Sequence, residues 1–265
     1  MNLFWRECRA QRKSLIIWSI GMLFMVVSGM AKYAALGSSG QSMTELFAEL
    51  PKSLRALLGI GSFDLSSPLG YYGVLFFYLA LMAAIHASML GANVIAKEER
   101  DHTFEFLLTK PISRTRIISF KLLSAICGVL ILNLVTLLSS IAQVGHYAKG
   151  EAVTGDIVVL FLGLFAMQMI FLLIGAAIAD VSRRSKLASG AASSVLLITF
   201  LLSVMIDLSD KLTFLEYFTP FKYFAAEKVL VESGFEPIFM VLSVLIIAAL
   251  LKVTYGFYQK RDMHG

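Results

Sequence analysis

The stretch DIVVLFLGLFAMQMIFLLIGAAIA, residues 156–179, has an acidic residue at its first position and no other charged residue. A helix needs about 20 mostly apolar residues to cross roughly 30 Å of hydrocarbon, so this stretch predicts a membrane-spanning helix. Five further runs of this kind lie near residues 14–36, 70–96, 117–148, 187–206 and 237–257. Each run is about twice as long as a strand of a membrane β-barrel. The sequence therefore predicts an all-α membrane protein with six transmembrane helices.

The composition of the whole chain agrees with this prediction. Of the 265 residues, 58% are hydrophobic and 15% are charged. The mean hydropathy is +0.78. These values exclude an ordinary soluble domain. No internal repeat or low-complexity tract divides the chain, so we treat residues 1–265 as a single transmembrane domain.

The positions of the basic residues predict the orientation of the chain. Sixteen of the 23 Lys and Arg residues fall in four segments, which are residues 6–13, 97–121, 183–186 and 252–261. Because positively charged flanks are retained on the cytoplasmic side, both termini should be cytoplasmic and the protein should lie in the cell membrane. Basic residues spread over four short segments track phosphates poorly, so no nucleic-acid partner is expected beside the lipid bilayer.

The stretch KEERDHTFEFLLTKPISRTR, residues 97–116, is unusually rich in charge for this chain. Glu98 and Glu99 stand with other acids near its start, where a helix dipole favours negative charge, and Pro111 should end the helix. One apolar face of this short helix consists of Phe104, Leu107 and Leu108. About two turns of helix are not stable alone in water. That face must rest on the protein's own spans, on the headgroups, or on a cytoplasmic partner.

The same stretch resembles the intracellular signature of the ABC-2 type transporter permeases. In that signature, acidic residues are followed by Gly-Thr, Glu, Leu-Leu, Pro and Ser-Arg, and a lysine opens the next span. The match falls on Glu99, Thr103, Glu105, Leu107, Leu108, Pro111, Ser113, Arg114 and Lys121. One departure is His102, which stands where the family has glycine. The runs TPFKYF at residues 219–224 and YQKRD at residues 258–262 are also similar to the family.

The resemblance implies that this helix is a coupling helix seated in a nucleotide-binding subunit. Leu107 and Leu108 would supply the buried contact, while Glu99, Glu105 and Arg114 would set the register by charge. The chain would then be the permease subunit of an ABC exporter, working as a homo- or heterodimer with two ATPase subunits. The expected partner-binding residues are Glu98, Glu99, Thr103, Phe104, Glu105, Leu107, Leu108, Pro111 and Arg114.

The chain itself contains no convincing catalytic motif. A P-loop needs G-x-x-x-x-G-K-[ST] to cradle phosphates, and the nearest run, GHYAKGE at residues 145–151, has Glu in place of the lysine. We expect no enzymatic activity and no bound cofactor, with ATP and magnesium held by the separate partner. The four histidines lie in four different segments, so no metal site is expected either.

Polar and small residues within the spans give two further expectations. His86, Asn133 and Gln168 fall near the middles of three spans, where they either line a substrate path or form hydrogen bonds between helices. Small residues recur every four positions at the start of the fifth span and predict either a dimer face or close packing within one subunit. These residues are Ser185, Ser189 and Ser193.

Two segments on the outer side carry features of their own. Residues 37–69 have apolar residues at helical spacing and predict an amphipathic helix, followed by a loop near residues 59–68. Residues 207–236 contain an aromatic cluster around Pro220, which predicts either a belt at the lipid headgroups or a binding site. The aromatic residues are Phe214, Tyr217, Phe218, Phe221, Tyr223, Phe224 and Phe235.

Three functions are compatible with these features. The leading hypothesis is an ABC exporter permease for a drug or an antimicrobial peptide, because the spans hold no charge cluster for a hydrophilic ion. An alternative is an ion- or proton-driven secondary transporter in which His86 titrates. The other alternative is a non-transporting scaffold or sensor that recruits a cytoplasmic partner through the same short helix.

Overall fold

The computed structural model describes residues 3–37, 50–100, 113–182, 185–231 and 234–260. Within these ranges the chain forms helices, turns and loops, and no strand. Six of the helices are long and apolar enough to cross a membrane. They are α1 (Leu3–Gly37), α4 (Pro68–Arg100), α6 (Arg114–Tyr147), α7 (Thr154–Val181), α8 (Ser185–Leu208) and α11 (Pro237–Lys260). The predicted fold class is therefore confirmed.

The helices extend beyond the apolar runs that predicted them. α1 begins at Leu3 and includes the basic segment at residues 6–13, and α4 continues to Arg100. Lys, Arg and Glu are good helix formers, so a helix can continue into the headgroup region after its apolar part has ended. Glu98 and Glu99 consequently lie in the last turn of α4, and the expected separate helix after them falls outside the described residues.

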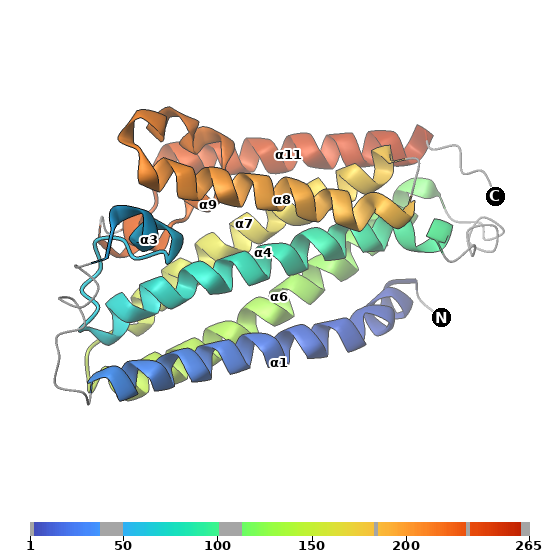
Figure 1. Cartoon of the computed structure of the whole chain (residues 1–265). Helices are drawn as coiled ribbons and strands as arrows, with labels where there is room; N and C mark the ends of the chain where they lie inside the picture. The colour runs from blue at the N-terminus through green and yellow to red at the C-terminus, as the bar shows by residue number, and fades with distance from the viewer. Residues whose placement is uncertain (1–2, 38–49, 101–112, 183–184, 232–233, 261–265) are drawn as a thin grey trace.

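The six long helices form one bundle with two distinct ends (Figure 1). α1 begins, α4 ends, α6 begins and α11 ends at the same end, which we call the terminal end. The described parts of the basic segments all lie there. The shorter helices lie at the other end, which we call the distal end.

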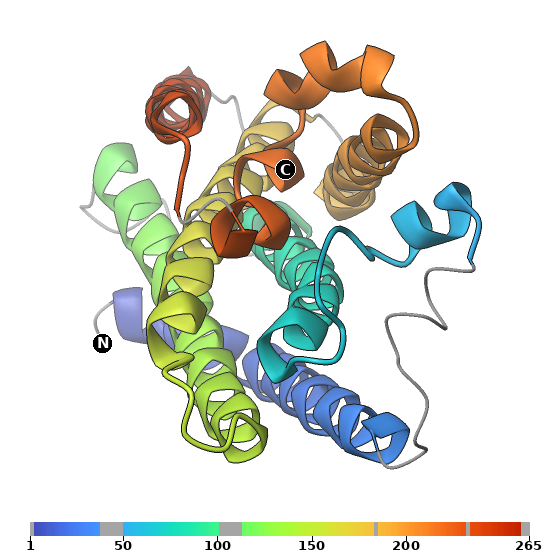
Figure 2. The same ribbon diagram turned by 90° about the vertical axis from the view of Figure 1, so that its left-hand side faces the viewer.

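Two helices form the centre of the bundle. α4 and α7 are the most deeply buried of the six, and they pack on each other more extensively than any other pair. Around them α1 packs mainly along α6, α8 packs on α4, and α11 packs on α7 (Figure 2). The chain therefore surrounds a central helix pair with four helices that face outward.

Glycines allow α4 and α7 to approach closely. A Cβ atom at Gly91 would lie 1.9 Å from the carbonyl oxygen of Leu172, and one at Gly175 would lie 2.1 Å from the carbonyl oxygen of Ser88. Both distances are far inside van der Waals contact, so the two backbones touch where no side chain fits. Any motion of α4 is therefore mechanically linked to α7.

The distal end is covered by two segments. The first contains α3 (Lys52–Leu57) and then non-helical chain up to Pro68, as predicted for residues 59–68; Leu46 and Phe47 of the expected amphipathic helix lie outside the described residues. The second contains the 3-10 helix η1 (Asp210–Phe218), α9 (Pro220–Tyr223) and α10 (Ala226–Val231). Figure 2, viewed toward the distal end, shows α9 and α10 lying across the middle of the bundle.

Candidate functional site

The predicted coupling segment lies between α4 and α6. Its core residues, Thr103 to Pro111, are outside the described residues, but both flanks are described. Ser113 caps α6 by accepting a hydrogen bond from the backbone N–H of Arg116 at 3.3 Å. Arg114, the first residue of α6, donates to the carbonyl oxygen of Gln259 at 2.9 Å. The exit from the coupling segment is thus fastened to the last turns of α11.

A buried lysine of α6 contacts the flank that precedes the coupling segment, which is the end of α4. Lys121 is only 1% exposed, and its Nζ donates to the carbonyl oxygen of Val94 in α4 at 2.5 Å. Sequence counting placed Lys121 among the basic residues that flank the membrane. It is buried because its long stem lies along apolar helix surface while its ammonium group reaches a carbonyl. Lys121 therefore ties α6 to the final turns of α4.

Two of the three polar mid-span residues meet. Asn133 of α6 donates through Nδ2 to Oε1 of Gln168 in α7 at 2.9 Å, and to the carbonyl oxygen of Phe161 at 3.4 Å. Both side chains are buried, and Nε2 of Gln168 has no hydrogen-bond partner among the described residues. The structure thus gives this pair the geometry of a hydrogen bond between helices.

His86 lies apart from that pair, on the side of α4 that faces α1. Its ring is 5.4 Å from the ring of Trp18, centroid to centroid, and its Nδ1 has no hydrogen-bond partner in the described part of the chain. A cavity of about 290 Å³ opens beside it toward the terminal end. The polar residues that line this cavity include Glu7, Gln11, Ser14, Asn93 and Lys97. His86 is therefore a mid-span candidate that lies on a cavity wall.

The serines of α8 face their own subunit at least in part. Ser189 donates through Oγ to Oδ1 of Asn93 in α4 at 3.0 Å, and the neighbouring Ala188 and Ala192 are fully buried. Ser193 is half-buried, and the structure does not describe the side chain of Ser185. Close packing within one subunit is thus observed for the central part of this pattern.

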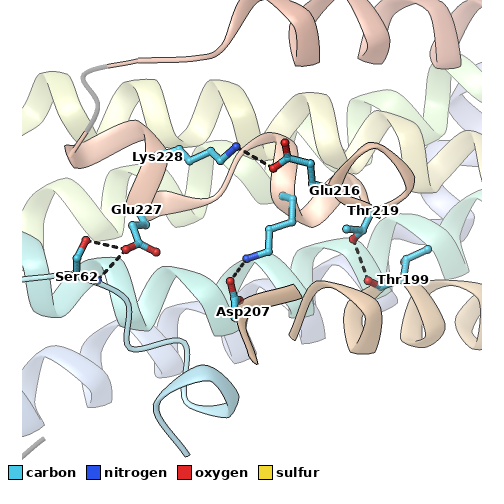
Figure 3. Close-up of polar contacts among 8 residues, drawn as sticks. Ser62, Thr199, Asp207, Glu216, Thr219, Glu227 and Lys228 are labelled. Carbon is cyan, nitrogen blue, oxygen red and sulfur yellow. Dashed lines mark hydrogen bonds and ion pairs between the residues drawn. The ribbon is translucent and has the colours of Figure 1, made fainter. Parts of the chain in front are cut away.

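Hydrogen bonds and ion pairs hold the second distal segment in place (Figure 3). Glu227 accepts from both N–H and Oγ of Ser62, at 2.8 and 2.7 Å, and thereby joins α10 to the loop before α4. Lys222 forms an ion pair with Asp207 at the end of α8. Thr219 donates to the carbonyl oxygen of Thr199 at 2.8 Å. The segment is therefore fixed to α8 and to the first distal segment.

Lys228 holds the second distal segment together internally. Its Nζ lies 3.2 Å from Oε2 of Glu216 (Figure 3) and 2.6 Å from Oε1 of Glu236. Burial lowers the pKa of Lys228, but the hydrogen bonds and charges of the two glutamates outweigh it and raise the pKa above its usual value. The ammonium group also lies 4.7 Å from the centre of the Phe239 ring in α11.

Six of the seven residues of the aromatic cluster divide into two groups, and the seventh, Phe235, is partly buried with its ring against that of Phe224. Phe221, Tyr223 and Phe224 are buried in the bundle core, where the Phe221 ring packs against rings of α7 and α8. Phe214, Tyr217 and Phe218 are exposed. A uniform belt at the headgroups is therefore wrong for the buried group, because α9 turns inward after Thr219 and carries it between the helices.

A cavity of about 360 Å³ lies beneath the two distal segments. Its floor is apolar and includes Phe76, Phe77, Leu164 and Met167, whereas charged side chains stand among its other walls. These charged residues are Lys52, Arg55, Asp207, Lys222 and Glu227. Nε of Arg55 is buried without a hydrogen-bond partner among the described residues. The cavity is thus amphipathic.

Six helices long and apolar enough to cross a membrane indicate an integral membrane protein, and cavities lie near both ends of its bundle. The chain matches the model of the family described as ABC-2 family transporter protein over residues 1–263, and it belongs to that family. Such permeases are transmembrane subunits that are not themselves catalytic, and they generally work with an ATPase subunit. No curated protein shows significant similarity to the chain.

Proposed function

We propose that this chain is the permease subunit of an ABC exporter of the cytoplasmic membrane, with its terminal end in the cytoplasm. The observation that supports this most is the family match over residues 1–263. The concentration of Lys and Arg at the terminal end supports the orientation, since positive flanks are retained inside. ATP and magnesium bind to the separate ATPase subunits, and two permease subunits pair with two of these.

The described flanks provide a route for coupling. An ATPase that grips the coupling segment moves the end of α4 and the beginning of α6 together, because Lys121 links these two helices. α4 carries α7 with it through the Gly91 and Gly175 contacts, and Arg114 connects α6 to α11. Displacement of one short segment thus reaches four of the six spans as rigid bodies.

The substrate that we propose is an amphipathic molecule, such as a drug or an antimicrobial peptide. The distal cavity supports this choice because its floor is apolar and aromatic while charged groups stand in its other walls. Ligand sites are commonly apolar with a few polar groups that fix orientation. Release toward the distal end makes the protein an exporter.

The coupling role is tested with paired aspartate substitutions. Leu107→Asp combined with Leu108→Asp should abolish copurification of the ATPase subunit and substrate-dependent ATP turnover in liposomes. The matched control is Leu57→Asp combined with Leu58→Asp, since these leucines are exposed at the distal end. The control should leave copurification unchanged. Normal copurification and transport in the Leu107/Leu108 variant would refute the coupling role.

A second measurement separates this proposal from a secondary transporter. ATP depletion should stop transport, whereas an uncoupler added at constant ATP should not. The reverse result would favour an ion-driven carrier, in which case His86→Gln should remove the dependence on the proton gradient.

A further inference from the structure

The contact between α1 and α4 contains a groove in addition to the polar cavity beside His86. An apolar groove of about 600 Å³ lies in the distal half of this contact, whereas the polar cavity beside His86 lies in the terminal half. The groove arises because α1 packs mainly on α6. On the side that faces α4, α1 carries the small residues Gly21, Ser28 and Gly29. One helix contact thus offers two chemically distinct surfaces.

The dimensions of the groove match one leaflet of a bilayer. Its helical walls run over residues 21–32 of α1 and 71–82 of α4, and Leu58, Ile60 and Leu65 of the first distal segment also line it. A helix segment of this length spans about 16 Å at a rise of about 1.5 Å per residue. The hydrocarbon core is roughly 30 Å thick, so each leaflet contributes about 15 Å. Gly21 and Met82 lie near the midpoints of their helices, and the groove runs from there toward the distal end.

Among the described residues that line the groove, a single one is charged, and it lies at the distal end. Lys32 is exposed, and it forms no ion pair or hydrogen bond within the described ranges. The remaining walls are mostly apolar side chains, among them Phe24, Met25, Val74 and Leu75. A long lysine near the end of a span extends toward the headgroups and attracts anionic lipid there.

We propose that this groove binds a phospholipid with an anionic headgroup from the leaflet at the distal end. One acyl chain lies along α1 and α4, and the ammonium group of Lys32 contacts the headgroup. Water is a poor occupant because the walls between Gly21 and Lys32 offer it few hydrogen-bond partners. The proposal stands whether or not the chain works with an ATPase.

The expected preference for anionic lipid is modest and measurable. One lysine near the surface favours an anionic headgroup by about 1 kcal/mol, which corresponds to about a five-fold preference. The purified full-length protein in detergent is titrated with phosphatidylglycerol and, separately, with phosphatidylcholine of the same acyl chains. Native mass spectrometry then counts the bound lipid of each kind.

Two substitutions separate the headgroup contact from the acyl-chain contact. Lys32→Gln should bind the two lipids equally. Gly21→Leu should lose the tightly bound lipid of both kinds, because a Cβ atom there lies 3.7 Å from Cε of Met82, without a clash, and the larger side chain extends into the groove. The controls are Lys211→Gln, an exposed distal lysine, and Gly256→Leu, where a Cβ atom meets nothing within 4 Å. Both controls should behave as the original protein does.

Three results would overturn the proposal. The first is that Lys32→Gln keeps the preference for phosphatidylglycerol over phosphatidylcholine. This result would overturn the proposal even if Gly21→Leu folds poorly. Retention of bound lipid in a well-folded Gly21→Leu is another. The third is that a second copy of the chain covers the groove. Ser28→Cys, introduced into a chain with Cys8→Ser and Cys127→Ser, would then form disulfide-linked dimers. We expect Ser28→Cys to remain unlinked.

Discussion

A backbone contact between α4 and α7 gives the sharpest stability prediction. Gly175→Ala places a Cβ atom 2.1 Å from the carbonyl oxygen of Ser88, where ordinary contact begins at 3.4 Å. The gap of about 1.3 Å can be opened only by moving α4 and α7 apart, because the opposing atom belongs to the backbone. Overpacking of this kind typically costs about 1–3 kcal/mol. That cost exceeds the gain of up to about 1 kcal/mol that Gly→Ala brings to a helix.

The matched control is the same substitution at a glycine with free space. A Cβ atom at Gly256 in α11 meets nothing within 4 Å, so Gly256→Ala should keep the helix-propensity gain. Thermal unfolding in detergent, followed by reaction of a thiol-sensitive dye with Cys8 and Cys127, reports both variants. We expect Gly175→Ala to unfold a few degrees below the original protein and Gly256→Ala at or slightly above it.

Equal midpoints for the two variants would refute the reasoning. Such a result would mean that the backbones of α4 and α7 do not touch at Ser88, and the route proposed for coupling would lose its central link. Gly91→Ala provides an independent check on the same contact, since its Cβ atom would lie 1.9 Å from the carbonyl oxygen of Leu172.

Three further predictions concern polar contacts. Glu227→Ala should lower stability by about 1.5–3 kcal/mol, the usual contribution of hydrogen bonds to a charged group. The loop at Ser62 should then be cleaved faster by protease in intact vesicles, and an unchanged cleavage rate would contradict this prediction. A double-mutant cycle with Asn133→Leu and Gln168→Leu should give a coupling free energy of about 0.6–2 kcal/mol in thermal unfolding, and additivity would show that the pair is not bonded. The pKa of Lys228 is raised in the folded state, so its contribution to stability is complete below its ordinary pKa of 10.5 and is lost as pH rises through the folded value. Lys228→Met should therefore remove this loss of stability at alkaline pH. The dependence of the unfolding temperature on pH between about pH 6 and pH 9 should stay unchanged.

The six spans were predictable because lipid imposes one requirement on each of them. A run such as residues 156–179 must be apolar over about 20 positions whatever it packs against, so the signal is local in the chain. The ends were less predictable, since helix continues through the charged residues of α1 and α4 once lipid no longer sets the composition. The inward turn of α9 at Thr219 depends on a hydrogen bond to Thr199, which no local pattern announces.

The site was predictable only where a motif is contiguous. The ABC-2 family could be recognised from consecutive residues in the stretch 97–116, whereas the pairing of Asn133 with Gln168 depends on the relative rotation of α6 and α7. The burial of Lys121 has no signal in the sequence, because its partner, the Val94 carbonyl, is a backbone group of another helix. The roles of Gly91 and Gly175 are not predictable from the sequence, since each forms a close contact only when the other helix is in place.

The bond between Ser62 and Glu227 also constrains how the protein is assembled in the membrane. The two residues are 165 positions apart in the chain. Translation proceeds from the N-terminus, so Ser62 is delivered to its side of the bilayer long before α8 and α10 have been synthesised. The surface around α3 must therefore be among the last parts of the molecule to mature, and a nascent chain halted after α7 exposes it to any quality-control protease on that side.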